Sequence, residues 1–115
     1  MSSTSVKIQA ISAINLTSIP SNVITVNLPA GKYAVTLTDD SMKYNSGSQV
    51  YIQQVILFNT APLQTADYEK WFYTVNTTEG TVISVAQNQP VYVFIVDQIT
   101  SDDNSGSANV NFTPI

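Results

Sequence analysis

Short apolar runs, separated by turn-forming residues about every 8–12 positions, are the feature that most constrains the fold of this chain. Residues 32–38 read as a strand with a period of two, in which Tyr33, Val35 and Leu37 lie on one face. Residues 91–96 are continuously apolar, which is typical of a buried strand. The spacing predicts an all-β, antiparallel β-sandwich or jelly roll of about seven to eight strands.

The length of 115 residues predicts a single domain spanning 1–115, with one hydrophobic core. There is no segment of about 20 consecutive apolar residues, so we expect no membrane-spanning helix. Residues 1–7 lack the basic and apolar regions of a secretory signal. The cellular location stays open between the cytoplasm, with release by a non-classical route, and action outside the cell.

The composition excludes several classes of function. The sequence has no cysteine and no histidine, so thiolate and imidazole metal sites, and catalysis by either group, are not expected. Its net charge of −4 disfavours nucleic acid and anionic membranes, because both require a cationic surface. A carboxylate glycosidase needs two carboxyl groups about 5–10 Å apart, and Glu69 and Glu79 are poor candidates. We expect a protein that binds without catalysing.

A polar segment, residues 97–107, separates the apolar run 91–96 from the alternating run 108–112. We expect these two runs to form a hairpin around it. A hairpin needs only about two to five turn residues, whereas this segment contains three aspartates, an asparagine and several hydroxyl groups. The excess of oxygen-bearing side chains calls for an explanation beyond reversal of the chain.

Calcium is one explanation, because Ca²⁺ takes about six to eight oxygen ligands and tolerates irregular geometry. Gly106 would allow the sharp return into the last strand. The alternative is a surface loop in which Asp, Asn, Ser and Gly simply favour turns. The predicted metal ligands are Asp97, Thr100, Asp103 and Asn104.

A second polar loop repeats the plan of the first. In each, a strand ends in aspartate and the loop leaves through the sequence Asn-Ser-Gly-Ser, at positions 45–48 and 104–107. We expect both loops at the same end of the sandwich, gripping one ligand from two sides; the alternative is a coincidence of common turn residues. The predicted ligand-binding residues are Asp39, Asp40, Tyr44, Asn45, Gln98, Asp103 and Asn104.

The pattern Asp97-x-x-Thr100-x-x-Asp103-Asn104-Ser105-Gly106-Ser107, between an apolar strand and a final alternating strand, resembles the calcium loop of the PA-IL-like galactose-specific bacterial lectins. A second likeness lies in the first strands, and together they cover about residues 15–35 and 81–112. The resemblance implies a small jelly-roll lectin in which one Ca²⁺ directly binds two hydroxyls of galactose.

The chain departs from this family in places that concern the sugar more than the metal. The loop is one residue shorter between Asp97 and Thr100 and lacks the usual Pro-Gly; residues 41–80 do not match, and the family's sugar-contacting histidine is absent. A flanking aromatic ring would pack on the sugar. Tyr44, inside the polar loop, is the better candidate, whereas Tyr33 and Trp71 are more typical of ordinary sheet residues.

The runner-up hypothesis is a structural, assembly or adhesion module in which the acidic loop holds a structural calcium or none. In either case the weakly charged apolar strands favour a homo-oligomer, and a weak sugar site gains avidity from one. We also expect Met42, beside Tyr44, to be a partly exposed hydrophobic residue.

Overall fold

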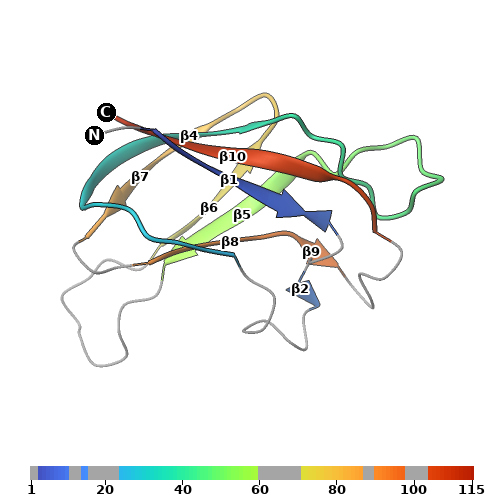
Figure 1. Ribbon diagram of the computed structural model, residues 1–115, viewed down its shortest axis with the longest axis horizontal. Helices are drawn as coiled ribbons and strands as arrows, with labels where there is room; N and C mark the ends of the chain where they lie inside the picture. The colour runs from blue at the N-terminus through green and yellow to red at the C-terminus, as the bar shows by residue number, and fades with distance from the viewer. Residues whose placement is uncertain (1–2, 11–13, 16–23, 60–70, 87–89, 98–103) are drawn as a thin grey trace.

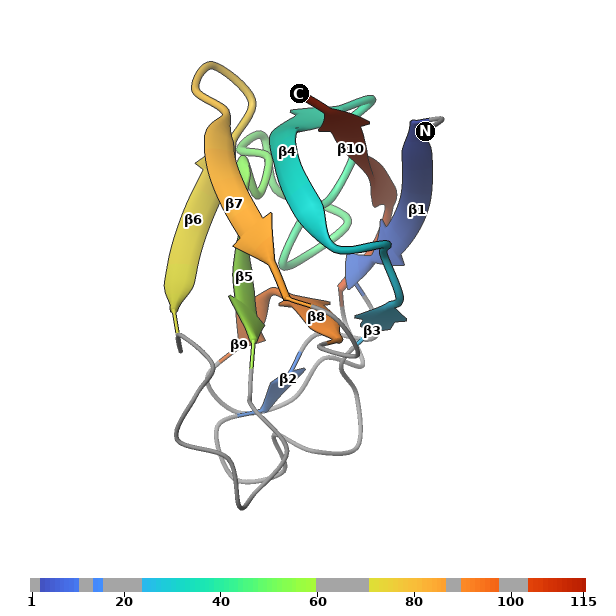
Figure 2. The ribbon, with the colours of Figure 1, turned by 90° about the vertical axis from the view of Figure 1, so that its left-hand side faces the viewer.

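The computed structural model describes residues 3–10, 14–15, 24–59, 71–86, 90–97 and 104–115. These residues form the predicted all-β sandwich of antiparallel sheets, drawn in Figure 1 and, turned by a quarter, in Figure 2. In chain order the strands are β1 (Thr4–Gln9), β2 (Ile14–Asn15), β3 (Ile24–Val26), β4 (Gly31–Thr38), β5 (Gln54–Asn59), β6 (Phe72–Asn76), β7 (Thr81–Val85), β8 (Val91–Phe94), β9 (Val96–Asp97) and β10 (Ser107–Pro114).

The two main sheets are four-stranded, one in the order β1-β10-β4-β7 and the other in the order β3-β8-β5-β6. A short parallel pair, β2 with β9, lies at one end (Figure 1). Among the described residues, no helix is long and apolar enough to cross a membrane.

The core lies between the two main sheets. It consists of the side chains that point inward at every second position along the strands. On β4 these are Tyr33, Val35 and Leu37, all buried, as the period of two predicts. The register places Val110 of β10 opposite Leu37 and Phe112 opposite Val35, so that both strands point their apolar residues inward. Tyr33 is a core residue rather than a ligand platform, and its hydroxyl donates a hydrogen bond to Pro29 O at 2.6 Å.

The outer faces of the two sheets differ in chemistry. On the first sheet, Asn111 of β10 donates a hydrogen bond to Thr38 Oγ1 at 2.9 Å and accepts one from Ser5 Oγ at 2.8 Å. On the second sheet, Phe58 stands opposite Phe72 on one side and Tyr92 on the other. The first outer face is therefore a polar ladder, and the second is an aromatic row across β6, β5 and β8.

The expected hairpin between residues 91–96 and 108–112 is wrong. β8 pairs with β3 and β5, whereas β10 pairs with β1 and β4, so the two strands belong to different sheets. The apolar run is also divided at the buried Ile95, where the chain leaves the main sheet and pairs with β2. The polar segment therefore crosses from one sheet to the other, which requires more residues than a tight turn.

The strand after the second polar loop is shorter than its sequence predicts. Apolar residues from position 50 favour a strand over 49–58, but β5 begins only at Gln54, and Val50 is 71% exposed. The segment before Gln54 instead follows the loop, where Ile52 N–H donates a hydrogen bond to Met42 O at 2.6 Å. Tertiary pairing has overridden local β propensity here.

Candidate functional site

The described parts of the two polar loops lie side by side, as their repeated plan predicts. Lys43 and Ser105 form an antiparallel bridge, with hydrogen bonds of 2.8 and 2.9 Å between their backbone N–H and carbonyl groups. Ser41 N–H donates to Ser107 O at 2.8 Å, and Ser107 N–H donates to Ser41 Oγ at 3.1 Å. This ladder connects the chain leaving β4 to the chain entering β10 and fixes the loops against each other.

Gly106 lies where the described parts of the two loops approach closely. It has φ of 85°, and a Cβ at this position would be 2.0 Å from Ser41 O. Met42, expected to be partly exposed, is fully buried at the same place. The loop is thus anchored in the core by the side chain of Met42. The polar residues around Met42 in the sequence give no indication of this burial.

Asn104, a predicted metal ligand, is 5% exposed, an unusual position for an amide side chain. Its Nδ2 donates a hydrogen bond to Ala10 O at 2.9 Å. Its Oδ1 has no hydrogen-bond partner in the described part of the chain. A buried carbonyl oxygen without a partner costs about 1–3 kcal/mol, and such an oxygen is a ligand of the kind that Ca²⁺ accepts.

The remaining predicted ligands of this loop lie at or beyond the edge of the described residues. Asp97 ends β9, where its backbone pairs with Asn15. Gln98, Thr100 and Asp103 lie outside the described residues. Among the residues that the structure does describe, no three acidic, histidine or cysteine side chains form a cluster able to hold a metal ion.

Asp40 begins the second loop and is partly buried. Burial raises the pKa of its carboxyl above the ordinary value, and the hydrogen bond that Met42 N–H donates to Asp40 Oδ1 at 2.9 Å opposes that rise. Burial is the larger effect, so the ionised carboxylate is less favourable here than in water.

The raised pKa of Asp40 predicts a pH dependence of stability. A carboxyl with a higher pKa in the folded chain stabilises the fold below its unfolded pKa, about 4, and this contribution is lost as the pH rises through the folded pKa. Asp40→Asn keeps an acceptor for Met42 N–H but cannot ionise. Urea unfolding measures the free energy of unfolding of both proteins. As the pH rises from acid to neutral, we expect this free energy to increase in Asp40→Asn relative to wild type. A difference independent of pH would contradict this prediction.

Two other predicted ligand-binding residues already make hydrogen bonds within the fold. Asp39 has φ of 55° at the end of β4, and its Oδ2 accepts a hydrogen bond from Asn109 Nδ2 at 2.9 Å. Asn45 Oδ1 accepts a hydrogen bond from Gly47 N–H at 2.8 Å, within a local turn. The local turn at Asn45 and the positive φ of Asp39 are both common for these residue types.

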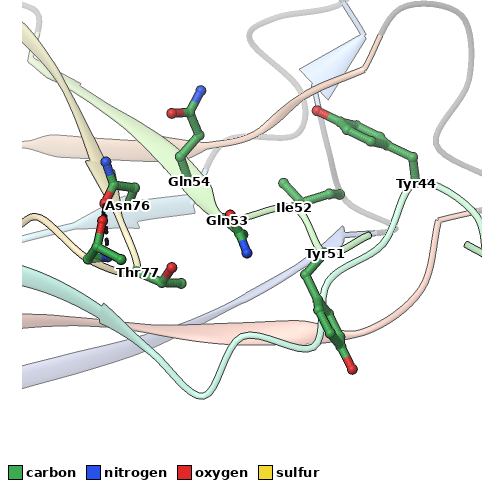
Figure 3. Close-up of a pocket in the computed structure, with 8 residues that line it drawn as sticks. Tyr44, Tyr51, Ile52, Gln53, Gln54, Asn76 and Thr77 are labelled. Atoms are coloured by element: carbon green, nitrogen blue, oxygen red, sulfur yellow. Dashed lines mark hydrogen bonds between the residues drawn. The ribbon is translucent and has the colours of Figure 1, made fainter. Parts of the chain in front are cut away.

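Tyr44 connects the loops to a pocket of about 430 Å³ (Figure 3). Its hydroxyl donates a hydrogen bond to Val96 O at 2.8 Å, directly before Asp97. Residues 51–54 and the turn 76–78 supply the rest of the lining. In Figure 3 Tyr44 lies at one end and the Asn76–Thr77 turn at the other, with Ile52 and Gln53 between them.

The turn at the far end of this pocket is held by its own hydrogen bonds. Asn76 Oδ1 accepts from Thr78 N–H at 2.9 Å, Thr78 Oγ1 at 2.8 Å and Glu79 N–H at 2.7 Å. Thr77 N–H donates to Gln53 O at 3.0 Å, which continues the pairing of β5 with β6 by one step. The pocket therefore has a structured rim on this side.

Gln53, Gln54, Asn76 and Thr77 were not predicted as site residues. Asn-Thr-Thr-Glu-Gly at 76–80 reads as a turn between two strands, and the two glutamines belong to what the sequence predicts as a continuous strand. Only the register of β5 against β6 brings these positions together.

Comparison of the chain with models of protein families, with curated proteins and with solved structures gives no match.

Proposed function

We propose that this chain is a carbohydrate-binding protein without catalytic activity, in which the loop from Asp97 to Asn104 holds Ca²⁺ and the ion binds hydroxyls of a galactose-type sugar. The observation that supports it most is the buried Asn104, whose Nδ2 is hydrogen-bonded and whose Oδ1 has no partner among the described residues. A divalent cation would satisfy that oxygen.

The rest of the proposed coordination shell comes from Asp97, Thr100 and Asp103. Carboxylate, carbonyl and amide oxygens are the ligands that Ca²⁺ prefers over nitrogen or sulfur. A shell left incomplete by the protein holds water, and adjacent hydroxyls of a sugar can replace two of these waters. A carboxylate in the loop can also accept hydrogen bonds from the same hydroxyls.

The loop ladder supports the proposal by holding the site's frame in place. Asn104 directly precedes Ser105, which bridges Lys43, and Gly106 O accepts a hydrogen bond from Ala10 N–H at 3.0 Å. Two separate parts of the chain, at Ala10 and at Lys43, thus fix one end of the proposed metal loop. A site with little freedom before binding loses less entropy when the ligand arrives.

The proposal is tested by calorimetric titration of the chelator-stripped protein with Ca²⁺, followed by a glycan array with and without the ion. We expect calcium binding and a galactoside signal that requires calcium. Calcium binding without any calcium-dependent glycan signal would overturn the lectin function and favour a structural ion in an assembly or adhesion module. Absence of calcium binding would overturn the metal site.

We further propose that the protein forms a homo-oligomer through the aromatic row on the outer face of the second sheet. Phe72 is 73% exposed there. Beside it, the rings of Phe58 and Tyr92 stack with centroids 4.9 Å apart, and Phe94 meets Phe58 edge-on at 5.3 Å. No outward side chain among the described residues of this sheet is charged. Two chains of net charge −4 can therefore meet at this face without bringing like charges together.

Phe72→Lys tests the oligomer. A lysine on this face of each copy introduces a repelling charge, so the dissociation constant from concentration-dependent light scattering should rise by at least about tenfold. Val82→Lys is the matched control, since Val82 is 54% exposed on the outer face of the other sheet. A wild-type chain that stays monomeric, or an equal effect of Val82→Lys, would contradict the assignment.

A further inference from the structure

We infer that the pocket between Tyr44 and the turn 76–78 binds a neutral pyranose ring directly, without a metal ion. This inference shares the carbohydrate class with the proposed function but does not require calcium, so a chelator separates the two. It rests on the chemistry of the lining, on the hydrogen-bonding groups that the fold leaves available, and on two fixed aromatic rings.

The lining is polar and carries no charged side chain. Among the residues that line the pocket are three carboxamides, from Gln53, Gln54 and Asn76, and the hydroxyls of Thr77 and Tyr51. A neutral lining gives no advantage to an anion or a cation. A carboxamide both donates and accepts hydrogen bonds, and so does each hydroxyl of a sugar, so this set of groups complements a neutral polyol.

Several of these groups are not used by the fold. Asn76 Oδ1 is occupied by its turn, but Asn76 Nδ2 has no hydrogen-bond partner within the described ranges. The side-chain amides of Gln53 and Gln54 also make no hydrogen bond to any described residue. Figure 3 shows Gln53 lying between the Asn76–Thr77 turn and Ile52. Donors and acceptors are therefore available at the pocket without breaking a structural contact.

Two tyrosines flank the pocket, and each is fixed by a contact of its own. Tyr44 is 47% exposed and is anchored by its hydroxyl on Val96 O at 2.8 Å. Tyr51 is 46% exposed, and Lys43 Nζ lies 5.0 Å from its ring centroid. The apolar face of a pyranose packs well on such rings. Rings held before binding reduce the entropy lost on binding.

The size of the pocket fits a small ligand. Its volume of about 430 Å³ lies within the range of about 300–1,000 Å³ that is typical of small-molecule sites. The ladder between β5 and β6 and the hydrogen bond from Thr77 N–H to Gln53 O hold the glutamine segment against the turn. A pocket formed mostly by backbone-paired segments is present before the ligand binds.

The test is a titration of the isotope-labelled full chain, in the presence of EDTA, with the methyl glycosides of galactose, glucose and mannose. Nuclear magnetic resonance reports directly on the side-chain amides of Gln53, Gln54 and Asn76. We expect saturable shifts of these signals with at least one glycoside at millimolar concentration. Gln53→Ala and Thr77→Val should each weaken binding by about fivefold, the equivalent of one hydrogen bond.

Gln9→Ala is the matched control, because Gln9 is an exposed glutamine on β1, in the other sheet. It should leave the affinity unchanged. Absence of saturable shifts with all three glycosides, or an equal loss in Gln9→Ala, would overturn the inference. In a parallel titration with Ca²⁺ in place of EDTA, shifts that appear only there and only near Asn104 would also overturn it, while supporting the proposed calcium site. Tighter binding of galacturonate than of galactose would contradict the preference for a neutral ring.

Discussion

Gly106→Ala should lower the free energy of unfolding by about 2–5 kcal/mol. About 1–2 kcal/mol comes from placing a residue with a Cβ in the left-handed region, since Gly106 has φ of 85°. About 1–3 kcal/mol more comes from overpacking, because the new Cβ would be 2.0 Å from Ser41 O. The contact is with backbone, so no flexible side chain can move away. Urea unfolding monitored by circular dichroism measures the change.

Gly47→Ala is the control for this substitution. Gly47 lies in the neighbouring polar loop and is exposed, and a Cβ there would meet Asn45 Oδ1 at an ordinary 3.4 Å. Its stability should change by less than about 0.5 kcal/mol. If Gly106→Ala were equally harmless, the close approach of the two loops would not exist in solution, and the frame of the proposed calcium site would be lost with it.

Asn104→Asp should make the stability of the protein depend strongly on calcium. Without the ion, a carboxylate in a site that is 5% exposed, with one oxygen facing Ala10 O, should cost about 3 kcal/mol. With calcium, the same carboxylate becomes a charged ligand and the loss should be largely recovered. Thermal unfolding measures the unfolding temperature with Ca²⁺ and with EDTA. The difference between these two temperatures should be larger in Asn104→Asp than in wild type.

Asn59→Asp separates a calcium effect from the general cost of burying a charge. Asn59 is 4% exposed, and its Oδ1 accepts a hydrogen bond from Trp71 N–H at 2.7 Å, within the pairing of β5 and the start of β6. This variant should be destabilised equally in calcium and in EDTA. Asp97→Ala and Asp103→Ala should abolish calcium binding in calorimetry while costing much less in the metal-free fold. If calcium leaves Asn104→Asp unchanged, Asn104 is not a ligand.

The β-sandwich is predictable from this sequence because large apolar residues recur at every second position in several strands. Tyr33, Val35 and Leu37 occupy every second position of β4, and the structure buries all three. The pairing partners of these strands are not predictable in the same way. Nothing local in residues 91–112 distinguishes a long hairpin loop from a crossing between sheets, since both need a polar connection between two apolar strands.

The meeting of the two polar loops was predictable from the sequence, whereas the contacts that depend on strand register were not. The repeated aspartate and Asn-Ser-Gly-Ser plan correctly indicated that the two loops meet. The burial of Met42 and Asn104 was hidden, because it follows from the meeting of distant segments. Gln53 and Asn76 come together only through the pairing of β5 with β6, which the sequence does not state.

The position of β10 has a consequence for how this protein can fold as it is synthesised. β10 is the last strand of the chain, yet it lies between β1 and β4, and β1 has no other strand partner in the described part of the chain. The first strand must therefore wait for the last, and sheets that depend on such distant pairings form slowly. On the ribosome, β1 and the buried carbonyl of Ala10 have their partners only after residues 104–112 emerge. Folding of the first sheet and of the proposed calcium loop should thus wait until β10 has been synthesised and has left the ribosome.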